Sequence, residues 1–396
     1  MKRIFVILVI LGGQLSFSLN AFSQHGLDSI LAKVSSSNKS IIAYNQFLEA
    51  RKTEYKTGLF LKNPTVELDY MKGTPATAGN QTDITAVQFF DFPTVYTRRK
   101  ELSDVNIEQL EMLANGYKQD ILLEAKLIYL ELIYLNKLNN QLIKRKKNAK
   151  LMHKAMLGNF EKGGASILDV NKAKINLASI QSGLRLAESE IGAATQKLIE
   201  LNGGIMVAVS DTLYPLTETG ASFETILGEA INGDYTLQSI QQNQQISQKE
   251  EQLNKALALP KIEGGYRYQS ILGQKFNGFH AGISVPLFEN KNRVQAAKQQ
   301  TLYYSLLEES HMNEYHNELE ALFNKSQSLK QSMEEYSELF SDVNSEELLT
   351  KAFQLGEISS IEYFMELTYY HKVYDDFLKL EREYYLALSE LKKYTL

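Results

Sequence analysis

Two carboxylates, Asp169 and Glu362, stand at the same place in two copies of one short motif. Each copy has an aromatic residue, a glycine three residues later and a serine after three more, and the copies lie 193 residues apart. The motif residues are Phe160, Gly163 and Ser166 in the first copy and Phe353, Gly356 and Ser359 in the second. A carboxylate three residues after such a serine can close a capping box at a helix start, and a ring of carboxylates can favour cations in a pore. The residues leave both roles open for Asp169 and Glu362.

Other kinds of site find little support in this chain. It contains no cysteine, which excludes disulfides, thiolate metal sites and a cysteine nucleophile. His311 and His316 are five residues apart, so they do not share a helix face as an i, i+4 metal-binding pair would. No catalytic triad and no phosphate-binding glycine loop is recognisable, and the net charge of −5 disfavours nucleic acid. We therefore expect no enzyme, no metal site, no cofactor and no nucleic-acid partner.

Glycines mark the predicted turns, and a basic run lies within one predicted helix. Gly163, Gly164 and Gly356 are expected to take positive φ angles in tight turns. The run at 144–147, which reads KRKK, is expected to be a solvated helix patch, with contact to a partner as the alternative.

Proline spacing and hydrophobic periodicity predict the elements that position these residues. Only six prolines occur, with none between 94 and 214 or after 286. Because proline costs about 3 kcal/mol inside a helix, these stretches permit very long helices. Apolar periodicity predicts helices at 27–61, 95–158, 166–201, 222–259 with an interruption near Gly233, 289–353 and 359 to near the end. Alternating apolar and polar residues predict strands at 64–71, 82–92, 260–270 and 276–287.

The chain also shows an internal duplication. Pro64 to Tyr70 resembles Pro260 to Tyr266 at an offset of 196, close to the offset of the first motif. This period is far too long for a solenoid repeat of roughly 20–50 residues.

We expect a signal peptide at 1–24. We also expect a first structural repeat at 25–220, with a helical hairpin at 95–201 and an equatorial loop, and a second repeat at 221–396, with a hairpin at 289–393.

The predicted elements fit an assembly better than a single soluble chain. Four strands from two separate hairpins cannot close a barrel, and their edges would be exposed. A helix of some 60 residues is about 90 Å long, which no compact core of this size would contain. Both difficulties disappear if several copies form a ring in which strands complete one sheet and helices complete one wall. One apolar and one polar strand face is typical of an outer-membrane barrel, with lipid on one side and water on the other.

These features resemble the TolC-type outer-membrane efflux proteins, or outer membrane factors, over essentially the whole mature chain. The resemblance implies a mainly α fold with a small β part. Each chain of a homotrimer would give its long helices to an α-barrel in the periplasm and four strands to a transmembrane β-barrel. The protein would be a passive exit duct in the outer membrane of a Gram-negative bacterium. Its partners would be outer-membrane lipid, a periplasmic adaptor (membrane fusion protein) and an inner-membrane pump of the RND type. The alternative is an exported coiled-coil scaffold or adaptor that is not inserted in a membrane.

The resemblance also suggests roles for individual residues. The motif residues around Gly163, Gly164 and Gly356 would form tips that contact the adaptor. The acidic residues that narrow the family's entrance would fall on Glu362 and, three residues later, on Met365, with Glu366 beside it. With Asp169, these carboxylates are the pore and gate candidates. The segment at 92–96, FPTVY, is similar to the heavy-metal efflux branch, although an exporter of organic molecules is equally compatible.

Overall fold

The computed structural model describes residues 26–215, 220–342 and 345–396. They form two compact units, each built from both halves of the chain. The first unit comprises the residues up to Ile42, Tyr117–Gly233 and Tyr315–Leu396, and the second comprises Ala43–Gly116 and Asp234–Glu314. The expected signal peptide at 1–24 lies outside the described residues. The two structural repeats, 25–220 and 221–396, remain a prediction from the sequence.

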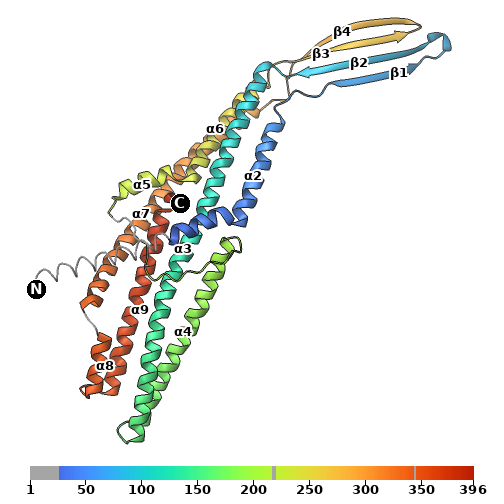
Figure 1. Cartoon of the computed structure of the whole chain (residues 1–396). Helices are drawn as coiled ribbons and strands as arrows, with labels where there is room; N and C mark the ends of the chain where they lie inside the picture. The colour runs from blue at the N-terminus through green and yellow to red at the C-terminus, as the bar shows by residue number, and fades with distance from the viewer. Residues whose placement is uncertain (1–25, 216–219, 343–344) are drawn as a thin grey trace, which may run out of the picture. The chain divides into compact units, whose positions relative to one another are not determined.

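The second unit carries a four-stranded antiparallel sheet in the order β1-β2-β3-β4 (Figure 1). The strands are β1 (Thr65–Lys72), β2 (Asn80–Phe90), β3 (Lys261–Ile271) and β4 (Gln274–Ser284). All four predicted strands are confirmed, with ends within three residues of those expected. β2 pairs with β3 although about 170 residues separate them, so the two hairpins share one sheet. Within the described residues, β1 and β4 have no neighbour on their outer edges.

The register gives this sheet one apolar and one polar face. Leu68, Ile84 and Tyr268 lie side by side across three strands on the apolar face. The side chains on this face are largely exposed, as Val66 at 71% and Phe279 at 98% illustrate. On the opposite face Arg267 lies 3.6 Å from Asp83. Because side chains alternate with a period of two along a strand, the alternation in the sequence predicted both faces correctly.

Long helices make up most of the chain, as predicted. Their bounds are α2 Lys39–Thr57, α3 Pro93–Glu161, α4 Ile167–Leu201, α5 Phe223–Asn232, α6 Tyr235–Ala256, α7 Arg293–Asp342, α8 Ser345–Leu355 and α9 Ser360–Leu391. Residues 26–37 are also helical, and η1 (Ala76–Ala78) and η2 (Lys393–Thr395) are short 3-10 turns. The expected interruption near Gly233 separates α5 from α6.

Two of the predicted helices need correction. The one expected at 27–61 is divided at Asn38, whose side chain accepts a hydrogen bond from Ile41 N at 2.9 Å and donates one to Leu201 O at 2.7 Å. An asparagine that satisfies the free amides of the next helix acts as its N-cap. The helix expected at 289–353 is present as α7 and α8, and α7 begins only after Asn292, whose φ of 68° is not helical.

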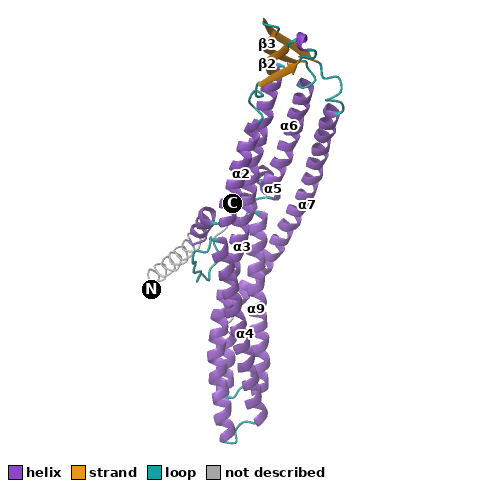
Figure 2. Ribbon diagram, turned by 90° about the vertical axis from the view of Figure 1, so that its right-hand side faces the viewer, coloured by secondary structure: helices purple, strands orange, loops and turns teal. Residues whose placement is uncertain are grey.

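The first unit is a bundle whose core lies between the helices. Its largest cluster of buried side chains joins residues 26–37 to the middle of α3 and the end of α4, and includes Val34, Leu132, Ile133 and Leu198, each at 0% exposure. Both views show α4 alongside the C-terminal part of α3 (Figures 1 and 2). Across the three described ranges, no helix is both long enough and apolar enough to cross a membrane.

Candidate functional site

The two motifs found in the sequence form two turns of the same construction, here called the tips: residues 160–166 between α3 and α4, and 353–359 between α8 and α9. Gly163 and Gly356 have φ angles of 76° and 78°. The next amide reaches back five residues in each turn, from Gly164 N to Asn159 O at 2.8 Å and from Glu357 N to Ala352 O at 3.0 Å. This pattern is the Schellman motif, which favours glycine because its φ is positive. The positive φ expected for Gly164 is wrong, because only the first glycine of the pair occupies the left-handed position.

Both tips lead into a capped helix. Ser166 Oγ accepts from Asp169 N at 3.2 Å, and Asp169 Oδ2 accepts from Ser166 N at 3.1 Å. The same reciprocal pair joins Ser359 and Glu362, with distances of 3.2 and 2.8 Å. These bonds satisfy amides that a helix start would otherwise leave without partners. The structural role considered for the two carboxylates is therefore present at both tips.

A side-chain hydrogen bond joins the two tips to one another. Ser360 Oγ donates to Asp169 Oδ1 at 2.7 Å across 191 residues of sequence. Hydrogen bonds from Ser360 and Ser166 hold the pKa of the Asp169 carboxyl below its ordinary value. Beneath this contact Phe353 packs against the buried cluster of Met156, Val170 and Ala173. The structure thus brings the two sequence motifs together at one place in the first unit.

The three candidate carboxylates have different surroundings. Asp169 uses both of its oxygens, one for its own cap and one for Ser360. Glu362 is exposed and bonds to its cap residue, and the backbone amide and hydroxyl of Ser359 lower the pKa of its carboxyl. Glu366 lines an open groove of about 480 Å³ together with Leu348 and Tyr369. Glu362 and Glu366 are thus both exposed, whereas Asp169 is half-buried.

The aromatic residues of the two motifs also differ. Phe353 is half-buried and lies 5.0 Å from Tyr363, ring centre to ring centre. Phe160 is 40% exposed. The second tip is therefore anchored by its aromatic residue, whereas the first presents its aromatic ring to solvent.

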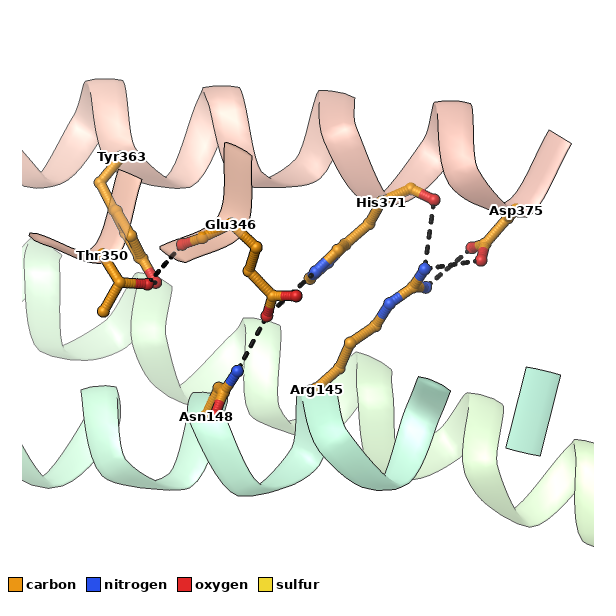
Figure 3. A network of polar contacts seen from close by, with 7 residues as sticks. All are labelled: Arg145, Asn148, Glu346, Thr350, Tyr363, His371 and Asp375. Carbon is orange, nitrogen blue, oxygen red and sulfur yellow. Dashed lines mark hydrogen bonds and ion pairs between the residues drawn. The ribbon is translucent and has the colours of Figure 1, made fainter. Parts of the chain in front are cut away.

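A network of polar side chains fixes α8 and α9 to α3 near the tips (Figure 3). Arg145 on α3 donates to both carboxylate oxygens of Asp375 on α9, at 2.9 and 2.8 Å. A bidentate pair of this kind adds geometric specificity as well as energy. The Arg145 side chain is 6% exposed and that of Asp375 is 31% exposed, so the pair is partly shielded from solvent and from salt. It therefore fixes the position of α9 against α3.

The second part of the network centres on Glu346 of α8. Asn148 Nδ2 donates to Glu346 Oε1 at 2.8 Å, and His371 Nε2 lies 3.9 Å from the same oxygen. His371 and Asn148 hold the pKa of the Glu346 carboxyl below its ordinary value, against the burial that would raise it. One turn further along α8, Thr350 Oγ1 lies 3.5 Å from the hydroxyl of Tyr363 on α9. The network thus contacts all three helices.

Sequence reasoning missed most of these contacts. The basic run at 144–147 was expected to be solvated throughout, but Arg145 is turned inward. The signal was available, because Arg145 lies three residues after buried Leu142 and four before buried Ala149, on the apolar stripe of the helix. Ser360 gave no such signal, because its partner is distant in the sequence.

Comparison with known proteins identifies the fold. No protein-family model matches the sequence, and no curated protein matches it. Solved structures match nearly the whole chain. The outer-membrane channel OprN has a TM-score of 0.76 at 14% identity, covering 94% of this chain and 90% of that one. CusC, described as a transmembrane channel, has a TM-score of 0.76 at 13% identity, covering 94% and 92%. The Campylobacter jejuni CmeC outer membrane channel has 0.72 at 13%, covering 93% and 85%. The chain has the fold of the TolC-type outer-membrane channels, as the resemblance predicted.

Ser360→Ala should loosen the contact between the tips and leave both capping boxes in place. The folded pKa of Asp169 lies below its ordinary value of 3.8, so the stabilisation is present above that value and is lost as pH falls through the folded pKa. Amide hydrogen exchange at residues 160–169 and 353–362 should be faster in the variant than in the wild type near pH about 6, and the difference should shrink as the pH falls below 3.8 and through the folded pKa. Thr368→Ala, which removes a hydroxyl that bonds within α9, is the matched control. Equal exchange in variant and wild type at every pH would contradict this role.

Arg145→Met should destabilise the first unit far more than Lys146→Met, although both remove one positive charge from the same basic run. The first change leaves Asp375 without its bidentate partner, at an expected cost of about 1–3 kcal/mol. The second alters an exposed side chain, for which changes within about 0.5 kcal/mol are usual. Thermal unfolding of the purified variants measures both. Similar melting temperatures would show that the network does not hold α9 to α3.

Proposed function

We propose that this chain is the outer-membrane exit duct of a tripartite efflux system. It would be a passive, non-enzymatic conduit through which small molecules or metal ions leave a Gram-negative cell. The observation that carries the proposal is the sheet of the second unit, whose apolar face is exposed and whose outer strands are unpaired within the described residues. An exposed apolar face suits contact with lipid, and unpaired edges suit pairing with further strands.

A homotrimer supplies those further strands. Three copies with four strands each would close one barrel of twelve strands in the outer membrane, and closure would leave no strand edge exposed. The long helices of the three copies would then continue the conduit into the periplasm. The fold shared with OprN and CmeC, both outer-membrane channels, supports this arrangement.

The two tips are proposed as the periplasmic entrance. Their turns would seat against a periplasmic adaptor of the membrane-fusion type. The adaptor would connect the duct to an inner-membrane pump of the RND type. Exposed Phe160 is the side chain most available for such a contact. Asp169 would act chiefly as a structural residue that couples the tips, because both of its oxygens already accept hydrogen bonds.

Glu362 is proposed as the carboxylate that favours cations at the entrance. It is exposed, and its lowered pKa keeps it charged at neutral pH. Three copies would bring three such charges to one ring. Glu366 lines the groove beside α8, and it is the second candidate for this ring. Both metal ions and small organic molecules are compatible with these residues as cargo.

Protein purified in a mild detergent should be a trimer of 44.9 kDa chains, less any cleaved signal peptide. After reconstitution into planar bilayers it should give stepwise ionic conductance, because each trimer would hold one water-filled pore. Light scattering and single-channel recording test the two statements. A monomer that stays soluble without detergent and gives no conductance would reject the duct and favour the exported scaffold.

Glu362→Gln should lower the preference for cations over anions in those recordings, because it removes one charge per chain from the proposed ring. The side chains have nearly the same volume, so the pore size should change little. Glu357→Gln is the matched control, since Glu357 is also exposed but lies within the turn of the same tip. Reversal potentials in a salt gradient report the selectivity. An unchanged reversal potential in Glu362→Gln would exclude this residue from the ring.

A further inference from the structure

The two helical hairpins of the first unit carry opposite charge. Residues 144–185 span the first tip, and residues 337–378 are their equivalents at the offset of 193. The first segment has ten basic and two acidic residues, a net charge of +8. The second has two basic and nine acidic residues, a net charge of −7. Two copies of one duplicated hairpin have thus become electrically complementary.

Most of this positive charge has no ion-pair partner within the described residues. Arg145 is the one basic residue of the first segment that forms an ion pair within the described residues. The other nine are exposed, among them Lys172, Lys174 and Arg185 on α4. Solvent-exposed charges of one sign repel one another. This face therefore favours a partner that brings negative charge.

The same face of α4 carries a row of exposed apolar side chains. Leu168, Ile175 and Leu186 are 67%, 69% and 61% exposed and lie opposite the buried side of the helix. At 3.6 residues per turn the three fall on one line along the helix, with Lys172 and Lys174 on either side of it. We call this line the α4 ridge. A helix with an apolar stripe on both sides is expected to be covered on both sides.

The acidic hairpin offers a groove of matching character. It lies where α8 and α9 meet the end of α7, has a volume of about 480 Å³, and is lined by Leu339, Leu348, Ile358, Tyr369 and Val373. Glu366, which is exposed, lines the same groove. An apolar channel that holds a carboxylate, on a hairpin of net charge −7, fits an apolar ridge with basic residues on either side.

We infer that the α4 ridge of one copy docks into the α8–α9 groove of the next copy. This inference rests on the ring of copies proposed above and assigns the surfaces that meet. Each chain has one basic and one acidic face, so the contact is head-to-tail and can close into a ring. Complementary charge suppresses the wrong pairing, because basic against basic or acidic against acidic is repulsive. The pair of Arg145 and Asp375 already joins the two hairpins with the same polarity inside one chain.

Charge reversal tests which surfaces meet. Lys172→Glu with Lys174→Glu should raise the concentration at which the oligomer dissociates by at least about tenfold, and so should Glu366→Lys. Combining all three changes should restore the oligomer to within about threefold of wild type, since the attraction returns with opposite sign. The matched control is Lys33→Glu with Lys298→Glu, two exposed lysines outside both segments. Light scattering in detergent at about 50 and about 500 mM salt measures dissociation, and high salt should reduce the difference.

Disulfide trapping keeps the test independent of those variants. The chain has no cysteine of its own, so a disulfide can form only between the introduced cysteines. Ser360 bonds to Asp169, which places Ile175 and Tyr369 at similar heights above the tips. Ile175→Cys with Tyr369→Cys should therefore cross-link neighbouring copies on mild oxidation and give covalent dimers and trimers. Leu186→Cys with Tyr369→Cys is the control, because Leu186 lies about 16 Å further along α4 than Ile175.

The outcomes separate this inference from the proposed function. Intact oligomers in both reversed variants, or reversals that the combined variant does not repair, would overturn the docking of these two faces. The absence of cross-links between Ile175→Cys and Tyr369→Cys in a conducting trimer would also overturn it, and the duct would stand. A wild-type protein that neither assembles nor conducts would reject the duct itself. Reversed faces that leave the trimer intact but lose an added adaptor would assign the basic face to the adaptor instead.

Discussion

The unpaired edges of one small sheet constrain the whole structure. β1 and β4 expose backbone donors and acceptors along their outer sides within the described chain, and one face of the sheet exposes its apolar side chains. Water can satisfy the edges but not the apolar face, whereas lipid covers the face but leaves the edges unsatisfied. The proposed closure with strands of further copies would resolve both conflicts at once. A fold that completes its sheet in this way would have reason to present matching surfaces on its helices as well.

The tips show how two turns of identical construction acquire different roles. Both end a helix with a Schellman motif and begin the next with a capping box, so the backbone is almost fully specified by local bonds. The differences lie in what remains available afterwards. Asp169 has its second oxygen bound by Ser360, and Phe353 is packed beneath it. Glu362 and Phe160 remain exposed. The same turn thus occurs twice, and one carboxylate links the tips whereas the other faces solvent.

A feature could be predicted from the sequence when the residues that interact lie close together along the chain. Strand faces and capping boxes depend on residues two or three positions apart. The strand faces were predicted, and the capping box was one of the two roles that the sequence left open for Asp169 and Glu362. The division at Asn38 was missed because its amide bonds to Leu201, far along the chain, as well as to its own helix. The bond between Ser360 and Asp169 spans 191 residues and leaves no periodic trace. Arg145 lies between these cases, since its place on the apolar stripe of α3 was visible but its partner, Asp375, was not.

The opposite charges of the two hairpins bear on how a ring with repeated units avoids wrong assembly. If both hairpins carried the same charge, every contact in the ring would be repulsive, and neither hairpin would distinguish its neighbour. With charges of +8 and −7 in equivalent segments, alternation of the two kinds is the arrangement of lowest electrostatic energy. The ion pair of Arg145 and Asp375 fixes this alternation inside each chain. In the proposed ring the exposed lysines of α4 would extend the same rule to the next chain, so a single pattern of charge would order the hairpins around the entire wall.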